Sequence, residues 1–462
     1  MTNCFSFALN YGLVESLPES VYTNFLSDVA KSRLPSPIRS LFPLEATPGM
    51  ISLLAGKPNP ASFPFTSFSF TARAPPGDPS GVPRTEEDIA VSLSNADLAA
   101  ALQYGPTNGF PALVDWFYQL QSVVHGRERG EGWSLSIGNG SQDLVSKAIV
   151  ALLNPGDPVL VQSPVYAGVI PLFHSLQCKQ IEVEADADGI SSDALRSILE
   201  QWPTSSPKPK ILYTIPYGGN PTGATASIQR RQEVLALARD HNLLIIEDDP
   251  YYYLYFGPSA SRPPSYFAME RSDPSCDGQA VGRVLRLDSL SKVLSAGLRI
   301  GVVSGPSPII RAIDAHTATA NLQPAGLTQA VAAALMNSPT WGHSGFLRHV
   351  DSVASLYKAK RDVFEEALQR HLGKDGLAEW STPQAGLFFW FRLIAADGDG
   401  DSAALVRTKA FERGVLALPG TVFLPDGRKT GYVRAAFSLL GPEEVDEAMK
   451  RLAQAVRDAA AQ

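Results

Sequence analysis

The sequence has few cysteines and histidines. Its 462 residues include three cysteines, Cys4, Cys178 and Cys276, which lie far apart and form no C-x-x-C pair. A disulfide framework and a zinc site are therefore not expected, and a reducing compartment fits this usage. The seven histidines are scattered without H-E-x-x-H spacing, so we expect no metal site.

The sequence also lacks the marks of membrane, secreted and nucleic-acid-binding proteins. No apolar run approaches the roughly 18 residues that span a bilayer, and the first residues match neither a signal nor a transit peptide. The net charge is −7, and Lys and Arg form no stripe, which argues against nucleic acid as a partner. We therefore expect a cytoplasmic protein without membrane or nucleic-acid partners.

Short apolar runs alternate with helical stretches through the middle of the chain. With 44% hydrophobic residues a large core is expected, and strands alternating with helices predict an α/β fold with a mostly parallel sheet. A long helix at 346–372, followed by GLFFWFRL and GYVRAAFS, predicts a smaller α+β domain. The runs that predict strands are 158–162, 210–215, 242–248, 283–288 and 299–304.

Polar residues follow three of these runs. NPTG begins at Asn220, EDDPYYY contains Asp248 and Tyr251, and SLSK ends at Lys292. Ligands of open α/β sheets bind beyond the carboxyl ends of the strands. Each residue alone could be a turn, a cap or a solvated charge, so it is their order along the chain that indicates a site.

The stretch SIGNGSQD (136–143) follows a predicted strand and begins a predicted helix. Free N–H groups at such a helix start favour an anion. The dinucleotide pattern G-x-G-x-x-G nearly fits, but Asp143 stands at its third glycine and Gln162 ends the next run, where an acid would bind ribose. An ordinary capped helix remains the other interpretation.

The ordered set NGSQ, SPVYAG, NPTG, EDDPYY, SLSK and GLRIG resembles the class I/II aminotransferases, which are fold-type I enzymes that depend on pyridoxal 5'-phosphate (PLP). LPSPIRSL, ISLLAGKPNPASFPF and LQYGPTNGFP resemble the aromatic amino acid, kynurenine and 2-aminoadipate aminotransferase subgroup. The resemblance implies a seven-stranded, mostly parallel sheet between helices and a smaller α+β domain. The domains implied are an arm (1–50), part of the small domain with a linker (51–100), a PLP-binding domain (101–336) and a C-terminal small domain (337–462).

The resemblance also implies roles for single residues. Lys292 would bind PLP covalently and move a proton between the substrate and the cofactor, and Asp248 would hold the pyridine nitrogen protonated. Asn220 and Tyr251 would hydrogen-bond the phenolic oxygen, and Tyr166 would stack on the ring. The phosphate would be bound by Ser141, Gln142, Ser289, Ser291 and Arg299, with Tyr104 reaching it from a second subunit.

The substrate residues implied lie at both ends of the chain. Arg434 would bind the α-carboxylate, and Arg39 would lie near the substrate side chain. The pocket would further include Gly56, Leu322 and Phe388, with Asn220 and Tyr166 shared with the cofactor site. The implied partners are amino acids and 2-oxoacids, with a homodimer as the assembly.

The resemblance is compatible with several activities. The first is transamination of aromatic L-amino acids with 2-oxoglutarate or an aromatic 2-oxoacid, giving aryl-pyruvates. A 2-aminoadipate or kynurenine aminotransferase, a β-lyase, a decarboxylase and a PLP-domain regulator are the alternatives. The loop at 256–282 has no assigned role, and Gly219 and Gln162 depart from the common family pattern.

Overall fold

The computed structural model describes residues 14–460 except 55, 78–87, 274–277 and 395–399. Cys4 and Cys276 lie outside these residues, as does part of the expected loop at 256–282. Among the described residues no helix is both long and apolar enough to cross a membrane.

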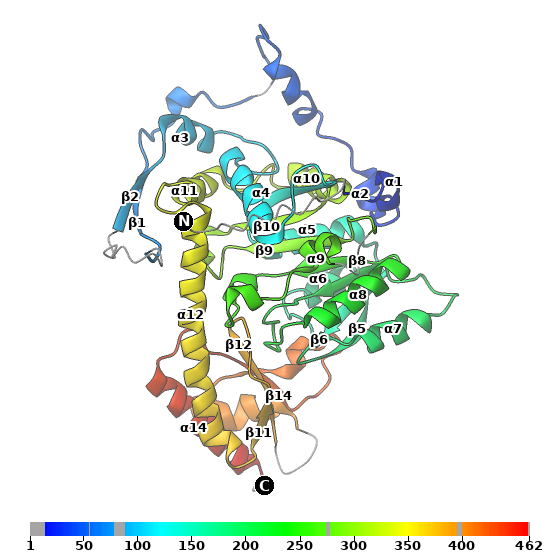
Figure 1. Ribbon diagram of the computed structural model, residues 1–462, viewed down its shortest axis with the longest axis vertical. Coiled ribbons are helices and arrows are strands. Elements are labelled where there is room, and N and C mark those ends of the chain that lie inside the picture. Colours follow the sequence, from blue (N-terminus) through cyan, green and yellow to red (C-terminus); the bar gives the residue numbers. More distant parts are fainter. Residues whose placement is uncertain (1–13, 55, 78–87, 274–277, 395–399, 461–462) are drawn as a thin grey trace, which may run out of the picture.

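A sheet of eight strands, in the order β3-β10-β9-β8-β7-β4-β5-β6, forms the centre of the larger lobe (Figure 1). The four pairings that join β9, β8, β7, β4 and β5 are parallel, while β10 runs antiparallel to both β9 and β3. The strands are β3 (Trp133–Gly138), β4 (Pro158–Ser163), β5 (Lys179–Asp186), β6 (Gly189–Ile190), β7 (Ile211–Thr214), β8 (Leu244–Asp248), β9 (Val284–Ser289) and β10 (Gly301–Pro306).

The expected α/β class is confirmed, but the sheet has eight strands and not seven. The additional strand, β6, is a two-residue strand that folds back antiparallel onto the edge strand β5. A strand this short leaves no hydrophobic pattern in the sequence, which is why the alternation of apolar runs did not reveal it.

Helices pack on both lobes and between them. Those of the larger lobe are α3 (Asn95–Ala101), α4 (Pro111–His125), α5 (Ser141–Leu152), α6 (Ile170–Ser175), α7 (Ser192–Glu200), α8 (Ile228–Asp240), α9 (Tyr266–Ser272), α10 (Ser307–Ala320) and α11 (Gly326–Met336). Helix α5 packs against α10 and against β10 and β9. Its position at the end of β3 places the start of α5 at the predicted anion site.

The smaller lobe is built on a four-stranded sheet in the order β11-β12-β14-β13. Its strands are β11 (Ala378–Trp380), β12 (Phe388–Leu393), β13 (Leu418–Pro419) and β14 (Tyr432–Ala436), and its helices include α13 (Ser402–Leu405) and α14 (Pro442–Ala460). The long helix α12 (Gly342–Leu368) joins the lobes (Figure 1). Phe346 and Val350 belong to the core of the larger lobe, whereas Phe364 and Leu368 belong to the second core.

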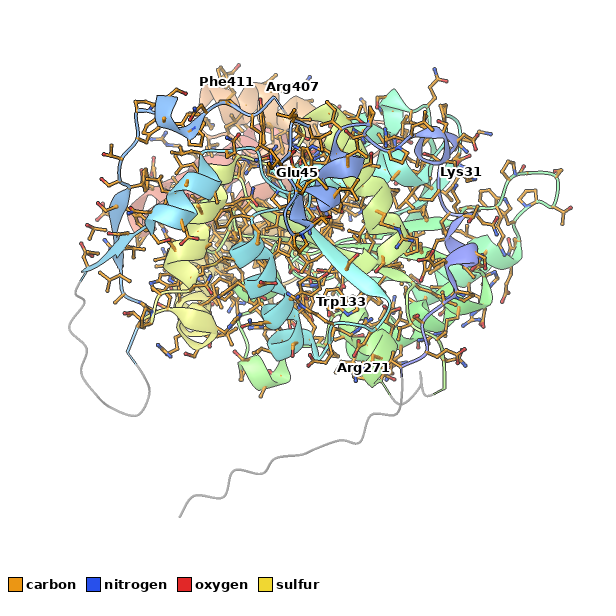
Figure 2. The ribbon with its side chains drawn as sticks, turned by 90° about the horizontal axis from the view of Figure 1, so that it is seen from above. Lys31, Glu45, Trp133, Arg271, Arg407 and Phe411 are labelled. Atoms are coloured by element: carbon orange, nitrogen blue, oxygen red, sulfur yellow. The ribbon has the colours of Figure 1, made fainter. Side chains whose placement is uncertain are left out.

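The segment before α3 forms an arm and a hairpin. Helices α1 (Glu19–Tyr22) and α2 (Asp28–Ser32) lie beside the larger lobe, and the chain then passes over its top through η1 (Arg39–Ala46) and η2 (Pro60–Ser62) (Figures 1 and 2). Strands β1 (Ser69–Arg73) and β2 (Asp88–Ser92) pair antiparallel. We expected 51–100 to form part of the small domain together with a linker. Within this range Phe70 and Val91 of the hairpin pack on the core of the larger lobe, and β2 contacts α11.

Candidate active site

Three adjacent parallel strands deliver the predicted polar residues to one edge of the sheet. Strands β7, β8 and β9 are neighbours, so the segments that follow them lead to the same edge. Asn220 follows β7, Asp248 ends β8, and Lys292 comes three residues after β9. Asn220, Asp248 and Lys292, which are far apart in the sequence, are therefore brought to the same edge of the sheet.

Asp248 is buried and is only partly satisfied by hydrogen bonds. Its Oδ2 accepts a hydrogen bond of 2.6 Å from the Tyr213 hydroxyl, and its Oδ1 is buried with no partner among the described residues. Burial raises the pKa of Asp248 to about 6, against the opposing effect of the Tyr213 bond. Such a carboxylate can accept a bond from a cationic N–H group.

Tyr213 was not predicted, although the sequence contains a signal for it. It lies in the buried strand β7 with 1% of its surface exposed, and a buried tyrosine hydroxyl usually has a hydrogen-bond partner. A tyrosine in the apolar run KILYTI next to the strand carrying Asp248 could have been assigned that partner.

Lys292 is half-buried and has no hydrogen bond or ion pair among the described residues. Burial lowers its pKa from the usual value, and the positive charges of Arg299 and Arg434 lower it further. A lysine with a lowered pKa is a better nucleophile and proton acceptor near neutral pH.

Arg434 extends from β14 of the smaller lobe to the same place. Its Nη1 donates a 2.9 Å hydrogen bond to Asn220 Oδ1, and its guanidinium carbon lies 4.2 Å from the centre of the Phe388 ring. Its Nε is buried without a partner, and no acid pairs with it in the described part of the chain. Burial lowers the pKa of Arg434. Phe388 in turn packs edge-to-face on Tyr251, with ring centres 6.0 Å apart.

A group of hydrogen-bond donors around Arg299 lies at the start of α5, near Lys292, and we call it the anion cradle. Arg299 donates from Nη1 to Ser291 Oγ (3.2 Å) and from Nη2 to the Asn139 carbonyl (3.2 Å), and it forms no ion pair with a carboxylate of the described residues. Arg299 adopts a left-handed conformation (φ 53°) that non-glycine residues rarely hold outside functional sites. Gly140 beside it has φ 84°, a backbone conformation that favours glycine, and a Cβ there would lie 2.3 Å from Arg299 Nη2.

The other predicted phosphate residues surround the cradle. Ser289 Oγ accepts a 3.2 Å hydrogen bond from the Ser291 N–H, and Ser141 is the first residue of α5. Gln142 Nε2 donates to the Gly168 carbonyl at 2.8 Å, close to Tyr166 in the chain. Burial, and then the charge of Asp248, raises the pKa of Tyr166.

The remaining predicted residues form a second group on and below the arm. Arg39 Nη1 donates to the Gly105 carbonyl (3.1 Å) and to Thr107 Oγ1 (3.0 Å). Gln323, next to Leu322, accepts a bond from the Gly105 N–H. Tyr104 and Leu322 are about half exposed, at 52% and 41%, and Gly56 is exposed. No hydrogen bond or ion pair among the described residues joins this group to Lys292.

The described residues fit PLP. The buried Asp248 Oδ1 matches a protonated pyridine nitrogen, and the unpaired Lys292 amine matches an aldehyde. The Arg299 guanidinium, which has no carboxylate partner among the described residues, matches a phosphate dianion. The family model of the class I and II aminotransferases matches residues 82–452. The chain belongs to this family. It is therefore a PLP-dependent aminotransferase.

Relatives match along nearly the whole chain. Aminotransferase tdiD of Emericella nidulans is 42% identical over 91% of this chain and 92% of its own length. The mitochondrial kynurenine/alpha-aminoadipate aminotransferase of Mus musculus is 37% identical over 95% and 99%. The aromatic amino acid aminotransferase C569.07 of Schizosaccharomyces pombe is 30% identical over 94% and 97%.

Solved structures share the fold. Aminotransferase Aro8 from Candida albicans superposes with a TM-score of 0.85 at 25% identity and covers 98% of this chain and 100% of its own. The kynurenine aminotransferase of Pyrococcus horikoshii, solved with PMP, has a TM-score of 0.70 at 27% identity and covers 94% and 98%. The fold-type I architecture expected from the motifs is thereby confirmed.

Proposed function

We propose that this enzyme transfers the amino group of the aromatic L-amino acids Tyr, Phe and Trp to 2-oxoglutarate or to an aromatic 2-oxoacid, releasing aryl-pyruvates. The observation that carries the proposal is the Arg434 guanidinium, which pairs with no acid among the described residues and lies above the Phe388 ring. Phe388 in turn packs on Tyr251. A cation for the α-carboxylate thus lies beside aromatic rings that suit an aromatic side chain.

Lys292 is proposed to hold PLP covalently and to accept the proton that leaves the substrate Cα. Its lowered pKa leaves a larger share of the amine neutral and able to take up that proton. When bound, PLP supplies an electron sink for the negative charge that develops at the Cα.

The other cofactor contacts are assigned from the geometry of their free atoms. Asp248 Oδ1 would accept from the pyridine N–H, and Asn220, whose Oδ1 is taken by Arg434, keeps its amide N–H groups for the ring oxygen together with Tyr251. Tyr166 would lie against the ring. Phosphate binding is assigned to Ser141, Gln142, Ser289, Ser291 and Arg299, with Tyr104 from a second subunit.

The second group is assigned to the substrate side chain. Arg39, Gly56 and Leu322 would border the distal end of the pocket, and Phe388 its base. Among the described residues Arg39 hydrogen-bonds to a carbonyl and a hydroxyl group and pairs with no acid, so its charge can bind an acidic side chain of the substrate. That observation favours 2-aminoadipate as a second candidate donor, and kynurenine is the other member of this alternative.

A homodimer with shared sites is part of the proposal. The arm exposes a run of large apolar side chains, with Leu34 at 83%, Ile51 at 87% and Leu53 at 98% of their surface. Apolar residues gathered in this way usually mark an interface. A second copy covering the arm would bring its own Tyr104 loop to the site.

A cytoplasmic location completes the proposal, supported by the three separated cysteines. A fluorescently tagged full chain should fill the cytosol. Enrichment in mitochondria, the location in the name of the mouse relative, would contradict this.

A donor panel tests the activity. The PLP form is mixed with L-Tyr, L-Phe, L-Trp, L-kynurenine or L-2-aminoadipate, and loss of the PLP absorbance is followed together with the 2-oxoacid released. Fastest conversion by the aromatic three supports the proposal. Preference for 2-aminoadipate or kynurenine would select the alternative, and pyruvate with ammonia from a cysteine conjugate would indicate a lyase.

A further inference from the structure

The stretch SIGNGSQD contains an acid, Asp143, in the first turn of α5, beside the cradle that is proposed to bind the phosphate. A carboxylate at a helix N-terminus interacts with the same free N–H groups and dipole that attract a phosphate. An acid at this position should therefore weaken phosphate binding unless its charge is neutralised. Its contacts show how that happens.

The two hydrogen bonds that the Asp143 side chain makes with described residues share one oxygen atom. Oδ2 accepts from the Asn139 backbone N–H at 2.9 Å and from Lys147 Nζ at 2.9 Å. The first bond ties the glycine-rich loop between β3 and α5 to the helix, and the second neutralises the charge of Asp143. Lys147 is buried, with 5% of its side chain exposed, against 26% for Asp143.

The loop is held on its other sides as well. Arg299 Nη2 binds the Asn139 carbonyl at 3.2 Å, so both polar groups of the Asn139 backbone are bonded. A Cβ on Gly301 would lie 2.5 Å from the Ser141 backbone nitrogen, which shows how closely β10 passes the loop. The N–H groups of Ser141 and Gln142 take no part in these contacts.

We propose that Asp143 and Lys147 are a neutral pair that positions the phosphate loop: the shared Oδ2 fixes Asn139, and the Lys147 charge cancels the repulsion between Asp143 and the phosphate. This inference rests on the proposed phosphate role of Ser141, Gln142 and Arg299. Neither Asp143 nor Lys147 contacts the reacting atoms, so both are positioning residues.

Single variants test separately how the Asn139 backbone is held and how the Asp143 charge is neutralised. Asp143→Ala removes the acceptor for Asn139, and Lys147→Met leaves the acid without its cation. Each should weaken PLP binding about tenfold, the effect of one lost charged hydrogen bond. Asp143→Asn keeps an oxygen at the Oδ2 position and should bind PLP as the wild type does.

The double variant distinguishes charge from structural damage. In Asp143→Asn/Lys147→Met the acid and the cation are both gone, so PLP affinity should return to within about threefold of wild type. Lys147→Met alone should show the strongest fall of PLP affinity at low salt, because its uncompensated acid repels the phosphate most when screening is weak.

Pyridoxal, which lacks the phosphate, provides the readout that a general loss of structure would not reproduce. The Kd values of PLP and pyridoxal are measured on the reconstituted full chain, with Asp193→Ala, another first-turn acid, as the control variant. Only the PLP values should change. Equal losses for both ligands, or a double variant no better than Lys147→Met, would overturn the inference. Failure of the wild type itself to bind PLP would instead overturn the proposed function.

Discussion

Arg434 of the smaller lobe and Asn220 of the larger lobe are joined by a 2.9 Å hydrogen bond from Nη1 to Oδ1. The bond connects β14 to the segment after β7, so the guanidinium that we propose to bind the substrate carboxylate is fixed relative to that segment. The position of this arginine is thus set by both lobes.

Replacing Arg434 by lysine should impair substrate binding more than cofactor binding. Lysine cannot offer the planar fork that both holds Asn220 and binds a carboxylate. We expect kcat/KM for the amino acid to fall about 100-fold, mostly through KM, in line with roughly 2–5 kcal/mol for truncating a buried charged contact. Steady-state kinetics and a PLP titration measure this. Arg392→Lys, at an exposed arginine of the same sheet, is the control, and an unchanged KM would argue against the assignment.

Replacing Lys292 by alanine should abolish turnover and the covalent link to PLP. In the proposed function this lysine is both the covalent attachment and the proton carrier, and loss of acid–base catalysis alone lowers rates by about 10²–10⁴. Mass spectrometry after borohydride reduction should find PLP attached to the wild type only. Lys358→Ala on α12, where the lysine is exposed, should keep the modification. PLP attached in the Lys292→Ala protein would contradict the central assignment.

The stability of the apoprotein should depend on pH through Asp248. Its folded pKa of about 6 lies above the unfolded value of about 4, so the folded state holds the proton more tightly. The stabilising contribution is complete below pH 4 and is lost as pH rises through 6, a total of about 3 kcal/mol for roughly two pH units.

Asp248→Asn removes this dependence, because the amide does not ionise while its oxygen can still accept from Tyr213. Urea unfolding of the apoproteins should therefore show the variant about 3 kcal/mol more stable than the wild type at pH 7 and nearly equal at pH 4. Asp193→Asn serves as the exposed control. Equal stability of wild type and Asp248→Asn at both pH values would refute the shift.

The exposed arm should control assembly. Leu53→Glu places a charge on a side chain that is 98% exposed in one copy of the chain, so the fold should survive while a hydrophobic interface would not. Analytical ultracentrifugation should then find a dimer for the wild type and a shift toward monomer for the variant. Phe411→Glu, on an exposed phenylalanine of the smaller lobe (Figure 2), should remain a dimer. A monomeric wild type would refute the proposed assembly.

The strand ends could be predicted from the sequence, because each buried strand is a short apolar run whose end is marked by polar residues. The runs ending near Asp248 and Lys292 became β8 and β9 with small shifts of their bounds. The packing of the hairpin at Phe70 and Val91 could not be predicted, since it depends on which lobe its apolar face meets. Nor could the sequence show that Arg39 bonds to Gly105, a contact across 66 positions.

Helix α12 has one further consequence. Its 27 residues span about 40 Å as a single rod, and its two ends are embedded in different hydrophobic cores. Neither hydrophobic core can unfold without exposing apolar side chains at one end of α12. The lobes are thus thermodynamically coupled, and heat should unfold the chain in one cooperative transition.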